Sequence, residues 1–89
     1  MSSHPTDFQG SVLDALREAI EHHIPSAQAE VAGAGGHFKI EVTSPAFAGK
    51  SMLESQRLVY KAIGHLMHGD TAPVHAVDSL VTRTPGAVA

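Results

Sequence analysis

Hydrophobic residues recur every three or four positions after Ser11, and this spacing predicts an amphipathic helix. Ser11 can cap the start of this helix, with Asp14 three residues further on. Pro25 ends it, because a proline disfavours the helical conformation of the residue that precedes it. The stripe that is expected to face a core consists of Val12, Leu13, Leu16, Ile20 and Ile24.

The same period returns from Met52 to about Met67 and predicts a second, longer helix. Ser51 and Glu54 have the spacing of a capping box at its start. The side chains expected to be buried are Met52, Val59, Ile63, and Leu66 or Met67. The opposite face carries Glu54, Arg57, Lys61, His65 and His68. We interpret the two histidines as part of a solvated helix face, although their spacing would also allow a stray metal ion to bind.

A period of two predicts the strands. Residues 38–43 alternate between apolar and polar types, and residues 27–31 do so more weakly. Residues 33–36 lie between these segments and include three glycines, so the two strands are expected to form a hairpin. A short helical turn is expected at 46–49, and a last strand is expected to run from Val74 to about Thr82, which would place His75 inside it.

These elements predict an α+β fold with the order α-β-β-α-α-β, arranged as a two-layer α/β sandwich with a three-stranded sheet. The 89 residues suffice for one domain, expected at residues 8–83, with flexible termini at 1–7 and 84–89. Such a chain has little room for a deep substrate pocket. It also contains no recognisable nucleophile–base arrangement or paired carboxylates, so we predict that it is not an enzyme.

Composition narrows the function further. The sequence is 43% hydrophobic and 17% charged, which is typical of a folded domain, and it has no run that could span a membrane. The start of the chain lacks the features of a signal peptide, so a cytoplasmic location is expected. There is no cysteine, which excludes disulfides and thiolate ligands from this chain. Seven histidines are a weak indication of metal or proton chemistry.

Four short motifs, in order, resemble the BolA family over about residues 10–83. They are His37-Phe38-Lys39-Ile40, the segment 44–51 with its Phe-Ala-Gly-Lys, Arg57-Leu58-Val59-Tyr60, and Val74-His75-Ala76-Val77. Gln56 stands where the family's helix motif has a histidine. The sequence resembles the short bacterial members of the acid-stress (IbaG-like) branch more than BolA itself. The resemblance implies a fold similar to a type II KH domain.

The resemblance also implies a partner and a cofactor. BolA-like proteins pair with monothiol glutaredoxins of the Cys-Gly-Phe-Ser type and share a [2Fe–2S] cluster with the glutaredoxin and its glutathione. The resemblance therefore implies that the isolated chain holds no tightly bound cluster. His75 would be one ligand and His37 the second. The glutaredoxin-facing surface would include the hairpin loop, the start of the last strand and the C-terminal end of the long helix. Without the resemblance, the sequence favours a partly buried strand histidine at His75 and a surface residue beside a turn at His37.

Nucleic-acid binding is the alternative, since some family members are described as transcriptional regulators of the stress response or cell morphology. Arg57, Lys61, Lys39 and Lys50 are the candidate contacts, and Arg83 is a possible neighbour. The net charge of −3 and the absence of a basic Gly-x-x-Gly loop between the helices weigh against it. A homodimer of the isolated chain is also left open by the sequence.

Overall fold

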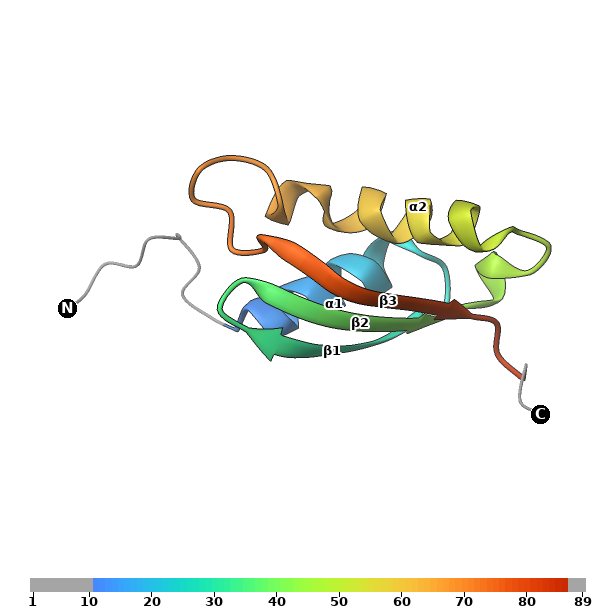
Figure 1. The fold of residues 1–89 in the computed structure, drawn as a ribbon. Helices are drawn as coiled ribbons and strands as arrows, with labels where there is room; N and C mark the ends of the chain where they lie inside the picture. The colour runs from blue at the N-terminus through green and yellow to red at the C-terminus, as the bar shows by residue number, and fades with distance from the viewer. Residues whose placement is uncertain (1–10, 87–89) are drawn as a thin grey trace.

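A computed structural model describes residues 11–86 of the chain (Figure 1). Two helices lie on one face of a three-stranded sheet, as the sequence predicts, so the fold is α+β in two layers. The expected short helical turn is a single 3₁₀ turn. In chain order the elements are α1 (Val12–His23), β1 (Gln28–Ala34), β2 (His37–Thr43), η1 (Pro45–Phe47), α2 (Met52–Ile63), η2 (Gly64–Leu66) and β3 (Ala76–Arg83).

The sheet has the order β1-β2-β3, with β2 at its centre. β1 and β2 form the predicted antiparallel hairpin, whereas β3 runs parallel to β2 and therefore needs the crossover that α2 provides. The β2–β3 register shifts between Phe38 and Lys39, because Val77 pairs with Phe38 but Ser79 pairs with Lys39. Asp78 is therefore the extra residue of a β-bulge.

The core lies between the helices and one face of the sheet. Alternate residues of β2 enter it, and the residues between them are exposed on the uncovered face, which is the pattern predicted from the period of two. The buried hydrophobic cluster consists of Leu16, Ile20, Ile24, Ala29, Phe38, Ile40, Val42, Phe47, Val59, Ala62, Ile63, Leu66 and Val74. Val12 and Leu13 of the predicted stripe are only partly buried against it.

Both helices are capped by serine as the sequence indicates. The Oγ atom of Ser11 accepts a hydrogen bond from the backbone N–H of Asp14 at 3.2 Å. At α2 the capping box is complete, since Ser51 Oγ accepts from the Glu54 N–H at 3.1 Å and Glu54 Oε1 accepts from the Ser51 N–H at 3.0 Å. These bonds satisfy N–H groups that the first turn of a helix leaves without partners.

Three expectations about the elements are wrong. Met52, the first residue of α2, is 73% exposed rather than buried. The last strand begins at Ala76 rather than Val74, so His75 precedes the strand. The long helix ends at Ile63 and continues only as the 3₁₀ turn η2, so it does not reach Met67.

The predicted flexible segment 1–7 lies outside the described residues, as do residues 87–89 of the other predicted end. Thr84 follows β3 directly, and Pro85 and Gly86 form a turn. Between residues 11 and 86, neither helix has the length and apolar character needed to cross a membrane.

Candidate functional site

His75 is positioned by the backbone that leads into β3. Its N–H donates to the carbonyl oxygen of Gly36 at 2.8 Å, and the N–H of Ala76 donates to the same oxygen at 3.0 Å. The imidazole of His75 packs directly against Gly36, where an added Cβ atom would lie 2.8 Å from both its Cγ and its Nδ1. Of its two ring nitrogens, Nδ1 is the one beside Gly36, and the residue as a whole is exposed.

His37 begins β2 and pairs in register with Ala76, the residue after His75. Its Nδ1 lies 3.2 Å from Oδ1 of Asp78, and both side chains are about half exposed, at 60% and 48%. The β-bulge makes this contact possible, because the extra residue Asp78 presents its carboxylate on the same face as His37. A carboxylate that accepts from Nδ1–H leaves Nε2 as the nitrogen with a free lone pair.

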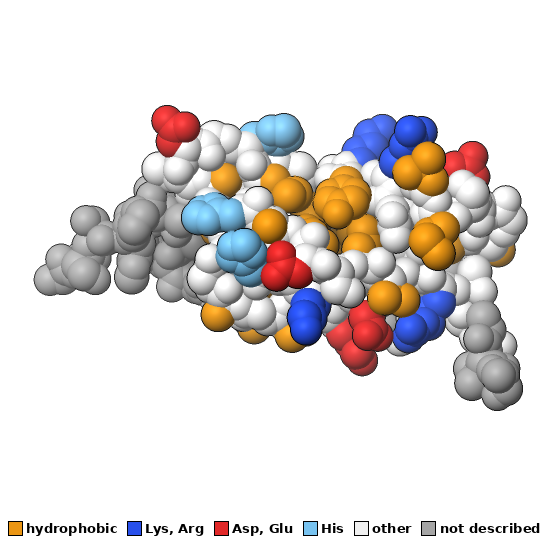
Figure 2. Space-filling view, in the orientation of Figure 1, with side chains coloured by type: hydrophobic (Ala, Val, Ile, Leu, Met, Phe, Trp, Pro, Cys, Tyr) orange, Lys and Arg blue, Asp and Glu red, His pale blue; other side chains and the backbone are white. Residues whose placement is uncertain are grey.

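The structure thus brings the two predicted histidines to the same end of the sheet. They stand on neighbouring segments, where adjacent strands are about 4.8 Å apart. Figure 1 places the β1–β2 turn beside the start of β3, and Figure 2 shows histidine side chains gathered next to an acidic one on the face in view. Within residues 11–86 no group of three or more His, Asp and Glu side chains could hold a metal ion alone.

Imidazole is a ligand for iron, zinc and other borderline metals, and a carboxylate beside one ring nitrogen is a common companion of such ligands. His37 and His75 are the two residues here that could each provide one imidazole. The sequence has no cysteine to supply thiolate ligands.

The candidate nucleic-acid contacts come together only in part. Lys50, Arg57 and Lys61 line one hollow of about 530 Å³ that extends along α2 from the residue before its cap to its last turn, and Glu54 lies among them. Lys39 lines a different hollow on the uncovered sheet face, beside Glu30 and Glu41.

Two further polar residues of this region already have partners within the fold. Arg83 forms an ion pair with Glu41 at 3.3 Å. Gln56, at the position where the resembling motif has histidine, donates from Nε2 to the carbonyl oxygen of Leu80 at 3.2 Å. The side chain at position 56 therefore ties α2 to β3.

Sequence reasoning missed Asp78 and the role of Gly36. No short sequence pattern around Asp78 predicts its contact with His37. The contact depends on a β-bulge in the parallel pairing of β2 with β3. Gly36 was identified as a turn residue, and its positive φ of 84° agrees with that interpretation. Its contact with the His75 ring depends on tertiary structure.

Comparisons with known proteins agree with the fold and with the motifs. The sequence profile of the family described as "BolA-like protein" matches residues 6–87. The chain is 35% identical to BolA-like protein 1 of Mus musculus over 74 residues, which is 83% of this chain and 47% of the mouse protein. The chain spans about half the length of the curated relatives it matches.

Solved structures show the same likeness. A BolA protein homologue from Coxiella burnetii superposes with a TM-score of 0.71 and 34% identity, covering 85% of this chain and 94% of the other. The BolA domain of SufE1 from Arabidopsis thaliana gives a TM-score of 0.69 at 31% identity, covering 91% of this chain and 100% of that domain. The likeness extends over nearly the whole described fold.

Proposed function

We propose that this chain, which belongs to the BolA-like protein family, acts as a non-enzymatic cytoplasmic partner of a monothiol glutaredoxin. In this proposal His75 and His37 each provide one imidazole to a [2Fe–2S] cluster, and the glutaredoxin and its glutathione provide the thiolates. The pair would serve iron–sulfur assembly, cluster transfer or iron regulation. The assignment to the acid-stress branch stays a prediction.

One observation carries the proposal: two exposed histidines from distant parts of the sequence lie at the same end of the sheet, His37 beside Asp78 and His75 beside Gly36. The Asp78 carboxylate beside Nδ1 of His37 matches the outer-shell partner that metal-bound histidines commonly have. Such a partner fixes the tautomer and raises the basicity of the ligating nitrogen.

Histidine ligands suit a cluster that is transferred to another protein. When imidazoles replace two thiolates on one iron, the reduction potential of a [2Fe–2S] cluster rises. Imidazole must be neutral to bind iron, so protons compete with the metal for these ligands.

The test is an anaerobic titration of a cluster-loaded monothiol glutaredoxin with this chain, followed by visible circular dichroism. We expect a new spectrum that saturates at equal stoichiometry. His75→Ala should fold normally and give a mixed cluster with a shorter lifetime, and His37→Ala should do so to a smaller extent. His22→Ala, at an exposed histidine in the last turn of α1, is the matched control. A His75→Ala spectrum and lifetime equal to wild type would show the ligand assignment to be wrong.

A second candidate function, nucleic-acid binding, is favoured by one observation, the grouping of Lys50, Arg57 and Lys61 around one hollow. Phosphate contacts of this kind weaken steeply as salt rises, and the slope depends on the number of cations involved. The double variant Arg57→Gln/Lys61→Gln should reduce both the affinity for duplex DNA and the salt slope. Binding that is insensitive to salt and to this variant would remove the candidate.

A further inference from the structure

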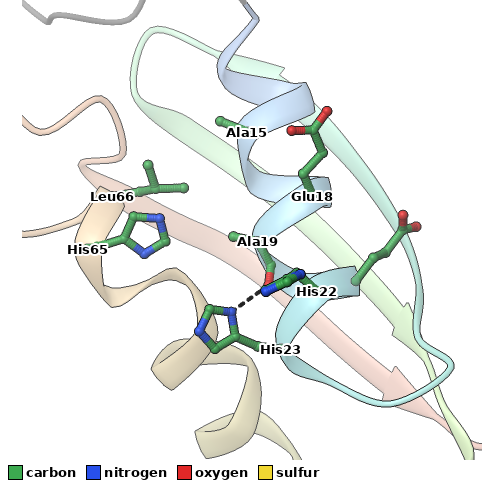
Figure 3. Close-up of a pocket in the computed structure, with 8 residues that line it drawn as sticks. Ala15, Glu18, Ala19, His22, His23, His65 and Leu66 are labelled. Carbon is green, nitrogen blue, oxygen red and sulfur yellow. Dashed lines mark hydrogen bonds between the residues drawn. The ribbon is translucent and has the colours of Figure 1, made fainter.

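A hollow of about 690 Å³ lies between α1 and η2, away from the histidine site described above. Apolar side chains form part of its wall, including Ala15, Ala19 and the buried Leu66. Three histidines and two glutamates complete the lining: His22, His23, His65, Glu18 and Glu21. Figure 3 shows that His22 and His23 come from the end of α1 and that His65 comes from the other side of the hollow.

A hydrogen bond to the backbone determines which ring nitrogen of His23 carries a proton. Its Nδ1 lies 3.1 Å from the carbonyl oxygen of Ala19, one helical turn earlier. A carbonyl oxygen can only accept, so Nδ1 must carry the proton, and Nε2 then bears the free lone pair. A metal-binding histidine typically has this arrangement, with its second nitrogen donating to a backbone carbonyl.

His65 supplies an imidazole from the facing element. The sequence pattern paired it with His68 on a solvated helix face, but the structure interrupts the helix at Gly64 and turns the chain into η2. His65 lines the hollow, and His68 is not among the lining residues. Two imidazoles from separate elements therefore border one space.

The electrostatics of the hollow favour a cation. His22 and His23 stand in the last turn of α1, where the helix dipole gives the backbone carbonyls a partial negative charge. Glu18 and Glu21 add carboxylates to the same lining, although Glu21 also accepts a hydrogen bond from the Ala29 N–H at 3.0 Å.

We propose that His23 and His65 form a binding site for a divalent borderline transition-metal ion such as Zn²⁺, separate from the cluster site. His23 Nε2 and the His65 imidazole are the protein ligands. Water fills the remaining positions, because within residues 11–86 no three ligating groups stand close enough to hold an ion alone. The site is therefore open and exchanges its metal readily.

The experiment is a titration of the full chain with Zn²⁺ alone, followed by calorimetry and by the ¹⁵N signals of the imidazoles. One saturable ion should bind and shift the Nε2 signals of His23 and His65. His23→Gln and His65→Gln should each weaken binding at least about tenfold, which is the lower end of what loss of an outer-shell partner costs. Glutamine keeps a polar side chain, and thermal unfolding verifies that each variant folds.

Two controls decide which histidines are responsible. His68→Gln, a neighbour of His65 that does not line the hollow, should bind Zn²⁺ like wild type. A chain in which His4, His37, His68 and His75 are all replaced by glutamine should keep the site, because only the three lining histidines remain. Loss of Zn²⁺ binding in that chain, undiminished binding in His23→Gln and His65→Gln, or no saturable binding by wild type would each overturn the proposal.

Discussion

Gly36 controls the geometry of the histidine site through two separate properties. Its φ of 84° is one that residues with a side chain rarely adopt, and the absence of a Cβ atom lets the His75 ring pack against it. Its carbonyl oxygen also accepts both N–H groups that lead into β3. One small residue thereby fixes where His75 stands.

Gly35 allows the effect of a positive φ to be separated from the effect of the contact between Gly36 and His75. Gly36→Ala and Gly35→Ala should each cost about 1–3 kcal/mol of stability, because both positions have positive φ. Only Gly36→Ala places a Cβ 2.8 Å from the His75 ring, whereas the space around Gly35 is open. Chemical unfolding and mixed-cluster lifetime measure the two effects. If both variants shorten the lifetime equally, Gly36 does not act through His75.

Asp78 is expected to matter for the cluster and little for folding. An exposed ion pair contributes about 0–1 kcal/mol, so Asp78→Ala should leave the free energy of unfolding within that range. Loss of an outer-shell carboxylate typically weakens metal binding about 10–100-fold, so the mixed cluster should be less stable. Arg83 and Glu41 form a comparable exposed pair, and Glu41→Ala is the control. A cluster unaffected by Asp78→Ala would exclude the positioning role.

At the scale of elements, the sequence predicted what repeats and missed what depends on neighbours. The periodic apolar residues of α1, β2 and α2 identified each element and the face that it buries. The start of β3 was misplaced because Val74 is buried as the chain enters the sheet and so resembles a strand residue. Met52 has an apolar side chain at a helical position, but it is the first residue of α2 and is largely exposed.

The candidate site was likewise predictable from the sequence only in part. Its two histidines could be proposed from motifs, since His37 and His75 each flank a strand with a recognisable pattern. The contact between His37 and Asp78 could not, because it requires a bulge at one position of the parallel pairing. The separation of Lys39 from the other candidate cations was also invisible, because it depends on which sheet face the helices cover.

The capping box of α2 predicts a pH dependence of stability. The N–H of Ser51 donates to Glu54, and this bond, together with the Ser51 hydroxyl and the nearby Lys50 and Arg57, lowers the pKa of Glu54. A lowered folded-state pKa stabilises the protein above the unfolded value of about 4.3, and this contribution is lost as the pH falls through the folded pKa.

Glu54→Gln tests this linkage, since glutamine can keep the backbone hydrogen bond but carries no charge. Wild type should be the more stable protein at neutral pH, and the difference in free energy of unfolding should shrink toward zero in acid. Denaturant unfolding at a series of pH values measures it. A difference that stays constant across this range would mean that the Glu54 charge does not contribute.

At the scale of the whole molecule, the histidine site and the start of α2 occupy opposite ends (Figure 1). His37 begins β2 and His75 directly precedes β3, whereas Lys50 precedes α2 and Lys61 stands in its last turn. A partner that completes the ligand set at the histidine end leaves the start of α2 uncovered. Lys50 is therefore the cation that distinguishes the two candidate functions.

This separation predicts how the mixed cluster responds to the loss of a cation at the start of α2. Lys50→Gln should leave the spectrum and lifetime of the mixed cluster within error of wild type, because Lys50 precedes α2, at the end of the fold opposite to the starts of β2 and β3. The same protein is used in the anaerobic titration with glutaredoxin. A large loss of mixed cluster in this variant would place the glutaredoxin at the start of α2 and would contradict our placement of the partner.

The central claim is that imidazole nitrogens of this chain bind the cluster iron. The most direct measurement is pulsed electron paramagnetic resonance of the reduced mixed cluster, with ¹⁵N-histidine incorporated only into this chain and an unlabelled glutaredoxin. We expect strong ¹⁵N couplings in wild type, and loss of one of them in His75→Ala. A wild-type cluster with no strongly coupled ¹⁵N would contradict the account.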